Sequence, residues 1–139
     1  MRQVVLDTDP LSYILNRRHP EVLSTGDQYI RVFRYFTVSA VTISEIVEGF
    51  ETAQDHERVA VFLKLAEDFE VMRNTDEATN AGQILGALSR TGQKVGELDP
   101  FIAATAICRK WPLVTNNIRH YQRIVDLGFP LELENWRKL

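Results

Sequence analysis

The sequence predicts an α/β fold in three layers, with a mainly parallel sheet of about four to five strands between two layers of helices. Short apolar runs alternate along the chain with longer stretches in which apolar residues recur at helical spacing. Strands separated by helices pair in parallel, and such a sheet is covered on both faces. No repeat or linker-like stretch divides the 139 residues, so we expect one domain over residues 1–139.

The N-terminal region begins with an apolar run that we expect to form a buried strand at residues 3–7. Asp9 and Pro10 then suit the N-cap and the first position of a helix that runs to about residue 18. A second helical stretch covers about residues 20–34, and Gly26 lowers its helix propensity.

The next region is predicted to form one strand and two helices. Residues 37–40 are the strand, and Thr42 opens a helix that continues to about Phe50. The second helix covers residues 55–69. Apolar side chains recur there at helical spacing, at Val59, Phe62, Leu63 and Ala66.

The middle of the chain continues the alternation. Residues 70–72 form a short strand, and Thr75 caps a helix that reaches about Thr91. Gly92 closes this helix, because glycine takes the left-handed conformation that commonly follows a helix end. Residues 93–98 are expected to form a loop.

The C-terminal part contains two helices and two strands. Asp99 and Pro100 open a helix through about residue 110, whose small side chains allow it to approach the sheet closely. The remaining elements are a strand at residues 112–115, a helix at 117–127 and a strand at 131–133.

Composition and charge restrict the possible functions. Apolar residues make up 45% and charged residues 25%, which is typical of globular proteins. The formal net charge of −3 counts against a basic clamp for nucleic acid, but it allows an enzyme that gathers carboxylates around a cation. The single cysteine, Cys108, excludes an intrachain disulfide and fits a reducing compartment. With no bilayer-length apolar run and no signal-peptide layout, we expect a cytoplasmic protein without membrane association.

Polar residues stand at the expected carboxyl ends of three strands. Asp7 ends the first strand, Glu45 follows the second within the next helix, and Thr115 and Asn117 follow the fourth. Asp99 joins them if its helix begins at the same edge. Because ligands of open parallel sheets bind outside the carboxyl ends of the strands, these five residues are the candidate site.

Each candidate also has a structural interpretation as a helix cap. Glu45 completes a capping box with Thr42, in which the glutamate reaches back to a backbone N–H. Asp7 has no such role if Asp9 is the cap of the first helix, and Glu48 is interpreted as a solvated charge.

The remaining candidates are open to the same alternative. Asp99 precedes proline and is a typical N-cap, while Thr115 and Asn117 suit the start of the last long helix. An amide or hydroxyl at these two positions could instead contact a metal-bound water or a substrate phosphate.

Convergence of three carboxylates favours a hard cation. Without one, Asp7, Glu45 and Asp99 would repel one another and some of their pKa values would rise. Mg²⁺, with Mn²⁺ as the alternative, prefers oxygen ligands and keeps several waters. Such a site suits phosphodiester hydrolysis, in which one ion activates the attacking water and a second steadies the leaving oxygen.

At this point the residues resemble a known family, the PIN-domain nucleases. The resemblance covers nearly the whole chain, in the right order, and is most similar to VapC-type toxins of bacterial toxin–antitoxin pairs. Its segments are residues 4–9 with the first catalytic aspartate, 38–46 with the glutamate, the aspartate-led 99–106, and 113–117 followed by Tyr121.

The resemblance implies a magnesium- or manganese-dependent endoribonuclease, usually a homodimer, that a small VapB-like antitoxin inhibits by blocking the acidic pocket. It implies that Asp7, Glu45 and Asp99 hold the metal and that Thr115 and Asn117 form the fourth part of the site.

This chain departs from the family pattern at two positions. Asp9 stands where the family usually has asparagine, which adds a charge near the site. Asn117 stands where many members have aspartate, which removes a charge from the place of a second ion.

His120 has no obvious carboxylate to orient it and is not predicted to be a general base. Basic residues at the expected rim either contact RNA phosphates or form ordinary solvated surface: Arg90, Lys94, Arg119 and Arg123.

Two other functions remain as alternatives. Asp7 and Asp9 also resemble the paired aspartates of haloacid-dehalogenase-type phosphatases, although Leu11 does not fit that pattern. A non-catalytic PIN-like binding module, whose acids serve only as caps, is the other alternative. The apolar residues 59–65 are expected to contribute to a dimer or antitoxin interface.

Overall fold

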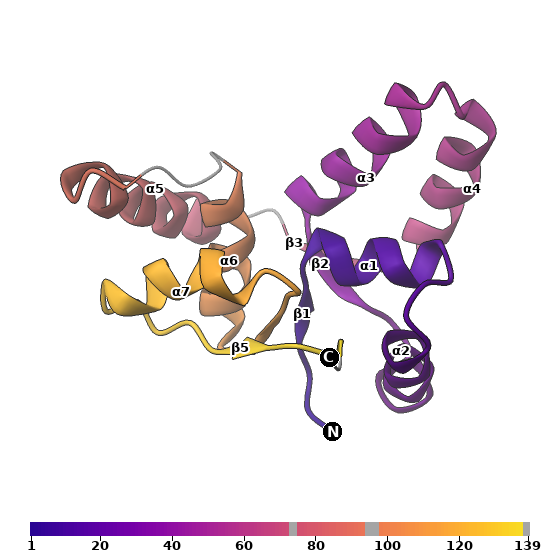
Figure 1. The fold of residues 1–139 in the computed structure, drawn as a ribbon, viewed down its shortest axis with the longest axis horizontal. Helices are drawn as coiled ribbons and strands as arrows, with labels where there is room; N and C mark the ends of the chain where they lie inside the picture. Colours follow the sequence, from indigo (N-terminus) through magenta and orange to yellow (C-terminus); the bar gives the residue numbers. More distant parts are fainter. Residues whose placement is uncertain (73–74, 94–97, 138–139) are drawn as a thin grey trace.

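The computed structural model describes residues 1–72, 75–93 and 98–137, and it contains a five-stranded sheet (Figure 1). All neighbouring strands run parallel, in the order β3-β2-β1-β4-β5. The prediction of a mainly parallel sheet of four to five strands is confirmed. The strands are β1 (Val5–Leu6), β2 (Thr37–Ser39), β3 (Glu70–Met72), β4 (Leu113–Val114) and β5 (Leu133–Glu134).

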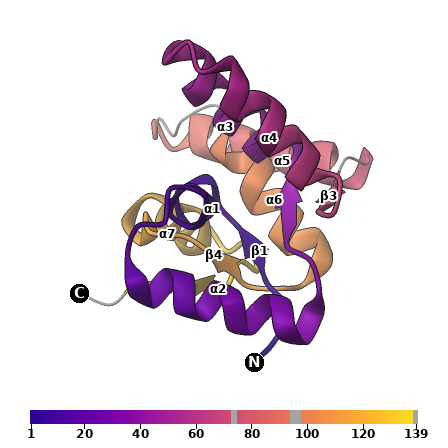
Figure 2. The same ribbon diagram turned by 90° about the vertical axis from the view of Figure 1, so that its right-hand side faces the viewer.

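Helices cover both faces of the sheet, so the three-layer arrangement is also confirmed (Figure 1). One layer contains α1 (Thr8–Leu15), α2 (Pro20–Phe33), α3 (Ala40–Thr52) and α4 (His56–Ala66). The other contains α5 (Thr75–Arg90), α6 (Asp99–Arg109) and α7 (Ile118–Asp126). Figure 2 shows α3 and α4 side by side above α1 and α2.

The three central strands, β1, β2 and β4, are buried, whereas the edge strands β3 and β5 are partly exposed. Val4 and Leu6 point into the core beneath α1–α4, whereas Val5 points into the core beneath α5–α7. Leu113 and Val114 of β4 divide between the two cores in the same way. This alternation follows from the two-residue period of a strand.

The first helix begins two residues earlier than predicted. Asp7, not Asp9, is the N-cap of α1, and its side chain accepts a hydrogen bond from the Thr8 N–H. Asp9 lies exposed in the first turn. The prediction for Asp9 was wrong because the chain turns directly from β1 into the helix, without the intervening residues that the Asp-Pro signal suggested.

The capping box predicted for α3 is also wrong. Ser39 is the N-cap, and its hydroxyl accepts from the Val41 N–H at 3.2 Å. Thr42 therefore lies inside the helix, where it is fully buried. Glu45 is then one turn too far along to reach the cap, and it is available for another role.

Neither Asp99 nor Asn117 caps a helix through its side chain. Leu98 is the N-cap of α6 and Asp99 is the first helical residue. Asn117 occupies the N-cap position of α7 without a side-chain bond, while its N–H donates to the Thr115 hydroxyl at 2.9 Å. The cap interpretation of Asp99 is thus wrong.

The ends of α1, α3, α5 and α6 share one hydrogen-bond motif, in which the N–H after a left-handed residue donates to the carbonyl five positions earlier. After α5, Gln93 N–H donates to Leu88 and Gly92 takes a φ of 69°, as predicted for this glycine. After α1, Arg18 N–H donates to Tyr13 in the same way, and Arg17 takes a φ of 53°.

Gly26 has a packing role that its low helix propensity did not suggest. A Cβ at this position would lie 3.1 Å from Ile14 Cδ1, so the glycine allows α2 to lie close to α1. The predicted loop at 93–98, with Lys94, falls mostly outside the described residues. None of the described helices combines the length and the apolar character needed to cross a membrane.

Candidate functional site

Asp7 is the buried centre of a polar cluster at the carboxyl end of β1. Its side chain is only 6% exposed, yet both of its oxygens are hydrogen-bonded. Oδ1 accepts from the Thr8 N–H at 2.8 Å and from the Tyr121 hydroxyl at 3.1 Å. Oδ2 accepts from the Thr115 hydroxyl at 2.8 Å. Residues more than 100 positions apart in the sequence thus fix one carboxylate.

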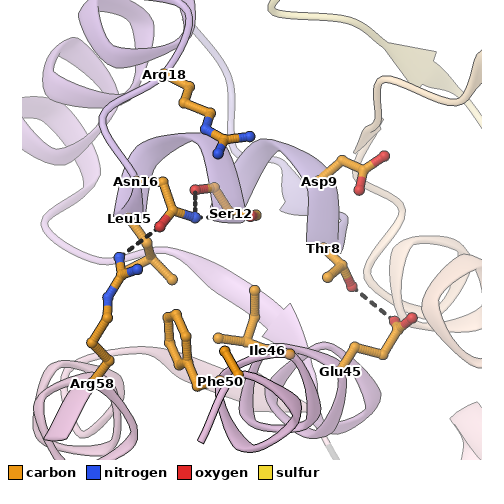
Figure 3. Close-up of a pocket in the computed structure, with 12 residues that line it drawn as sticks. Thr8, Asp9, Ser12, Leu15, Asn16, Arg18, Glu45, Ile46, Phe50 and Arg58 are labelled. Atoms are coloured by element: carbon orange, nitrogen blue, oxygen red, sulfur yellow. Dashed lines mark hydrogen bonds between the residues drawn. The ribbon is translucent and has the colours of Figure 1, made fainter. Parts of the chain in front are cut away.

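Glu45 reaches the same cluster from α3. Its Oε1 accepts a hydrogen bond from the Thr8 hydroxyl at 2.8 Å (Figure 3). Thr8 therefore touches two candidate acids, because its N–H binds Asp7 and its hydroxyl binds Glu45. The side chain of Glu45 is half-buried, whereas Glu48, one turn later, is exposed as predicted.

Asp99 approaches from the opposite layer, at the first residue of α6. Its Oδ2 lies 2.6 Å from Nε2 of His120. Nδ1 of the same ring contacts the Arg123 guanidinium at 2.8 Å. Because a guanidinium only donates, Nδ1 is the acceptor and Nε2 carries the proton that is donated to Asp99. The prediction that His120 lacks a carboxylate partner was therefore wrong.

Burial and mutual repulsion raise the pKa values of all three acids. Burial, with a smaller contribution from the charge of Asp99, raises the pKa of Asp7 to about 6, although the hydrogen bonds from Thr115, Thr8 and Tyr121 lower it. Burial is also the main cause of the raised pKa of Glu45, with Asp99 and Asp9 adding to it. The pKa of Asp99 is raised by burial and by Asp9, although His120 opposes the shift.

Hydrogen bonds connect the surroundings of these carboxylates: Thr8 bonds to both Asp7 and Glu45, and the adjacent residues His120 and Tyr121 bond to Asp99 and Asp7. Asp7, Glu45 and Asp99 are therefore neighbours at the carboxyl edge of the sheet, but their role as joint ligands of one ion stays a prediction, because among the described residues they are not grouped closely enough to hold it. Tyr121 lies between them, and burial followed by the charges of Asp7 and Asp99 raises its pKa. Its hydroxyl thus remains a donor to Asp7 at neutral pH.

Thr115 and Asn117 are placed differently with respect to the acids. Thr115 is fully buried and bonds directly to Asp7, while the side chain of Asn117 is exposed beyond it. Asn117 lines a shallow hollow together with His120 and two of the predicted basic residues, Arg119 and Arg123. Arg90 is exposed at the end of α5 and is not one of the residues that line this hollow.

The chemistry of the donor set fits a hard divalent ion. The three acids offer carboxylate oxygens whose mutual repulsion a cation would relieve. Over residues 1–72, 75–93 and 98–137, however, no three Asp, Glu, His or Cys side chains are already grouped so that they could hold one ion. Glu45 faces Thr8 and Asp99 faces His120, so coordination requires these two side chains to rotate.

Three residues of this cluster were not assigned a role from the sequence. Thr8, His120 and Tyr121 each bond to a candidate acid. The available signal was positional: Thr8 directly follows the first aspartate, and the other two lie in the first turn of a helix that starts at the carboxyl edge. Their types alone do not distinguish them from ordinary helix residues.

Comparison with known proteins gives consistent matches. The PIN domain family matches residues 4–126. Ribonuclease VapC2 of Haemophilus influenzae is 32% identical over 98% of this chain and 99% of that protein. The tRNA(fMet)-specific endonuclease VapC of Shigella flexneri is 36% identical over 71% of this chain and 74% of that protein. The structure of DNA-bound VapBC from Salmonella typhimurium has a TM-score of 0.80 and 28% identity, over 98% of this chain and 99% of that one.

Proposed function

The chain belongs to the PIN domain family and to its VapC ribonucleases, and we propose that it is a divalent-metal-dependent endoribonuclease, the toxin of a VapBC-like toxin–antitoxin pair. One observation carries the assignment of the site. Acidic side chains that follow β1, lie on α3 and begin α6, far apart in the sequence, belong to one polar network at the carboxyl edge of the sheet and have raised pKa values. A cluster of that kind is costly to maintain unless it serves chemistry.

Asp7, Glu45 and Asp99 would hold the ion, with Mg²⁺ as the proposed metal and Mn²⁺ as the alternative. A bound ion supplies a water of lowered pKa and positive charge facing the phosphate. Asp7 is the fixed part of the site, because Thr115 and Tyr121 hold its two oxygens. Glu45 and Asp99 are the adjustable parts, since both are less buried than Asp7 and a cation can replace their partners, which are Thr8 for Glu45 and His120 and Tyr121 for Asp99.

Asn117 and the rim residues act at the substrate side of the site. The exposed amide of Asn117 is positioned to hydrogen-bond a phosphate oxygen of the bound RNA. Arg119 adds positive charge to the hollow that Asn117 lines. We propose that RNA enters across this rim in the cytoplasm, where its phosphates meet cations that partly offset the acidic site.

The two alternative functions fit less well. A haloacid-dehalogenase-type phosphatase needs Asp9 beside Asp7 as a general acid, but Asp9 is exposed and the family match is to the PIN domain. A binding module whose acids act only as caps does not explain Glu45 or Asp99, because neither side chain caps a helix.

The decisive experiment replaces Asp99 with asparagine. We expect Asp99→Asn to abolish RNA cleavage in Mg²⁺ or Mn²⁺, because the variant loses a metal-binding charge. Its free energy of unfolding should change by less than about 1 kcal/mol, since no cap bond is lost and the asparagine amide oxygen can still accept the hydrogen bond from His120. Asp27→Asn on α2 makes the same chemical change at an exposed position and is the control. Cleavage by Asp99→Asn at the control rate would reject the proposed site.

The protein partners are proposed from the exposed apolar residues of α4. Val61 and Leu65 line a groove with Leu15 and Phe50, and this groove is the proposed seat of a VapB-like antitoxin. Leu63 points elsewhere, into a hollow formed with Ile43 and Val71, which we assign to a homodimer contact. Residues 59–65 were expected to form an interface. Their exposed apolar side chains lie on two faces of one helix, and we propose a different partner for each face.

A further inference from the structure

We propose that the cleft between α1 and the α3–α4 hairpin is an RNA-binding cleft, in which Arg18 and Arg58 hold a backbone phosphate at a distance from the one that is cleaved. This subsite rests on the proposed nuclease function and extends it. The cleft has a cavity volume of about 390 Å³. Thr8, Asp9 and Glu45 line one end of it, and Asn16, Arg18 and Arg58 line the other (Figure 3).

Arg18 is held at the mouth of the cleft by the backbone. The hydrogen-bond motif that ends α1 places Arg18 directly after the left-handed Arg17, with the Arg18 N–H bound to the Tyr13 carbonyl at 2.8 Å. Arg18 is one of the residues that line the cleft, and in Figure 3 its guanidinium lies above α1, whereas Arg58 and Phe50 lie below this helix. Among the residues that the structure describes, this guanidinium forms no ion pair and no hydrogen bond.

Arg58 is held on the facing side by its side chain. Nη2 donates to the Asn16 side-chain oxygen at 2.6 Å, and the guanidinium lies over the Phe50 ring at 4.7 Å. The Asn16 amide is itself fixed, because its nitrogen donates to the Ser12 carbonyl at 2.9 Å. Within the described chain Arg58 has no carboxylate partner, so its remaining donors are free to bind an anion.

The charge pattern of the cleft favours a phosphodiester strand. Carboxylates at one end suit a cation that meets the scissile phosphate, while two unpaired guanidinium groups at the other end suit a second phosphate. The helix between them, α1, has eight residues and spans about 12 Å. That length corresponds to a few nucleotides, so one strand can reach both ends.

The test measures RNA affinity in an Asp99→Asn background, which prevents cleavage and leaves the lining of the cleft unchanged. A labelled 12-nucleotide single-stranded RNA is titrated by fluorescence anisotropy at several salt concentrations. Arg18→Ala and Arg58→Gln are the variants, and Arg31→Ala, exposed on α2, is the charge-matched control.

We expect each cleft variant to weaken binding roughly five- to tenfold and to reduce the slope of log affinity against log salt by about 0.7, with Arg31→Ala unchanged. In otherwise wild-type enzyme, KM for the 12-mer should rise with kcat unchanged, while a dinucleotide substrate shows no difference. Cleft variants that bind like Arg31→Ala overturn the subsite.

The remaining outcomes separate the subsite from the proposed function. If the wild type cleaves RNA but neither arginine affects affinity, the subsite alone is wrong. If the arginine variants weaken only the complex with the antitoxin, the cleft is a protein-binding site and the RNA assignment is overturned. If the wild type cleaves no RNA in either metal, the nuclease function fails and the subsite fails with it.

Discussion

The burial of Asp7 has two opposing effects on its carboxylate. It must be buried to receive hydrogen bonds from Thr115 and Tyr121, and burial is also what raises its pKa to about 6. The hydrogen bonds lower the pKa but do not restore the ordinary value of 3.8. In the absence of a cation the ionised carboxylate therefore destabilises the folded state relative to the unfolded one.

The first prediction concerns the pH dependence of stability without metal. Below pH 3.8 Asp7 is protonated in both states, and between pH 3.8 and about 6 only the unfolded state loses the proton. The contribution of Asp7 to the free energy of unfolding should thus fall as pH rises through this window, by about 3 kcal/mol for two pKa units, and stay low above it. Urea denaturation in EDTA at several pH values measures this change in the free energy of unfolding.

Asp7→Asn is the comparison that isolates this contribution from the other titrating groups. The difference in unfolding free energy between variant and wild type should grow in favour of the variant from pH 4 to pH 7. Added Mn²⁺ should remove the pH 7 deficit of the wild type. A difference that is independent of pH would show that Asp7 ionises normally in the folded protein.

The second prediction concerns the Tyr121 hydroxyl. Tyr121→Phe removes a donor from a buried carboxylate, so we expect a loss of about 2 kcal/mol of stability at pH 7.5. The loss should be smaller at pH 4.5, where Asp7 is protonated. Tyr13→Phe is the control, because its hydroxyl accepts from the neutral Asn116 amide, and its effect should not vary with pH. Equal losses at both pH values for Tyr121→Phe would exclude the proposed role.

The candidate acids could be predicted from the sequence, but their partners could not. Asp7, Glu45 and Asp99 were found because each stands at or just beyond the carboxyl end of a strand or the start of a helix. Tyr121 is 114 positions from Asp7, so its hydrogen bond depends on the packing of α7 against β1. No local pattern encodes a contact of that range.

At the scale of elements, the kinds of helix and strand were predictable and their first residues were not. Several residues that favour N-caps stand near the starts of α1 and α3, and the preceding strand determines which of them is the cap. Asp7 displaces Asp9 at α1, and Ser39 displaces Thr42 at α3, because each helix begins as soon as its strand ends. The displaced cap at α3 is also what releases Glu45 for the acidic cluster.

The third prediction concerns the end of α1. Arg17 takes a left-handed conformation that costs a side-chain-bearing residue about 1 kcal/mol, whereas glycine adopts it freely. We expect Arg17→Gly to raise the free energy of unfolding by about 0.5–1 kcal/mol, measured by urea denaturation. Gly92→Ala makes the opposite change at the equivalent position after α5 and should lower the free energy of unfolding by a similar amount. A destabilised Arg17→Gly would show that the Arg17 side chain makes contributions beyond its backbone conformation.

At the scale of the whole molecule, two cores on either side of one sheet leave α4 incompletely covered. Phe62 is 2% exposed and anchors the helix, yet Val61, Leu63 and Leu65 are 66%, 47% and 46% exposed. Three large apolar side chains exposed on one helix of eleven residues indicate a surface that another chain covers. Their directions differ, since Val61 and Leu65 face the groove beside α1 and Leu63 faces the hollow beside β3.

The last prediction separates the two proposed partners with two substitutions on this helix. Leu63→Glu places a charge in the homodimer hollow, so the variant should sediment as a monomer at concentrations where the wild type is a dimer, and it should still bind the antitoxin. Val61→Glu places the same charge in the groove, so it should weaken the antitoxin complex at least tenfold and leave the dimer intact. Each variant is the control for the other, because both side chains are exposed and neither substitution should lower the free energy of unfolding by more than about 0.5 kcal/mol. Sedimentation velocity and titration calorimetry give the two readouts. Loss of both the dimer and the antitoxin complex in one variant would mean that the two faces are not independent. A monomeric wild type would exclude the proposed homodimer. The antitoxin groove would then be tested by Val61→Glu alone.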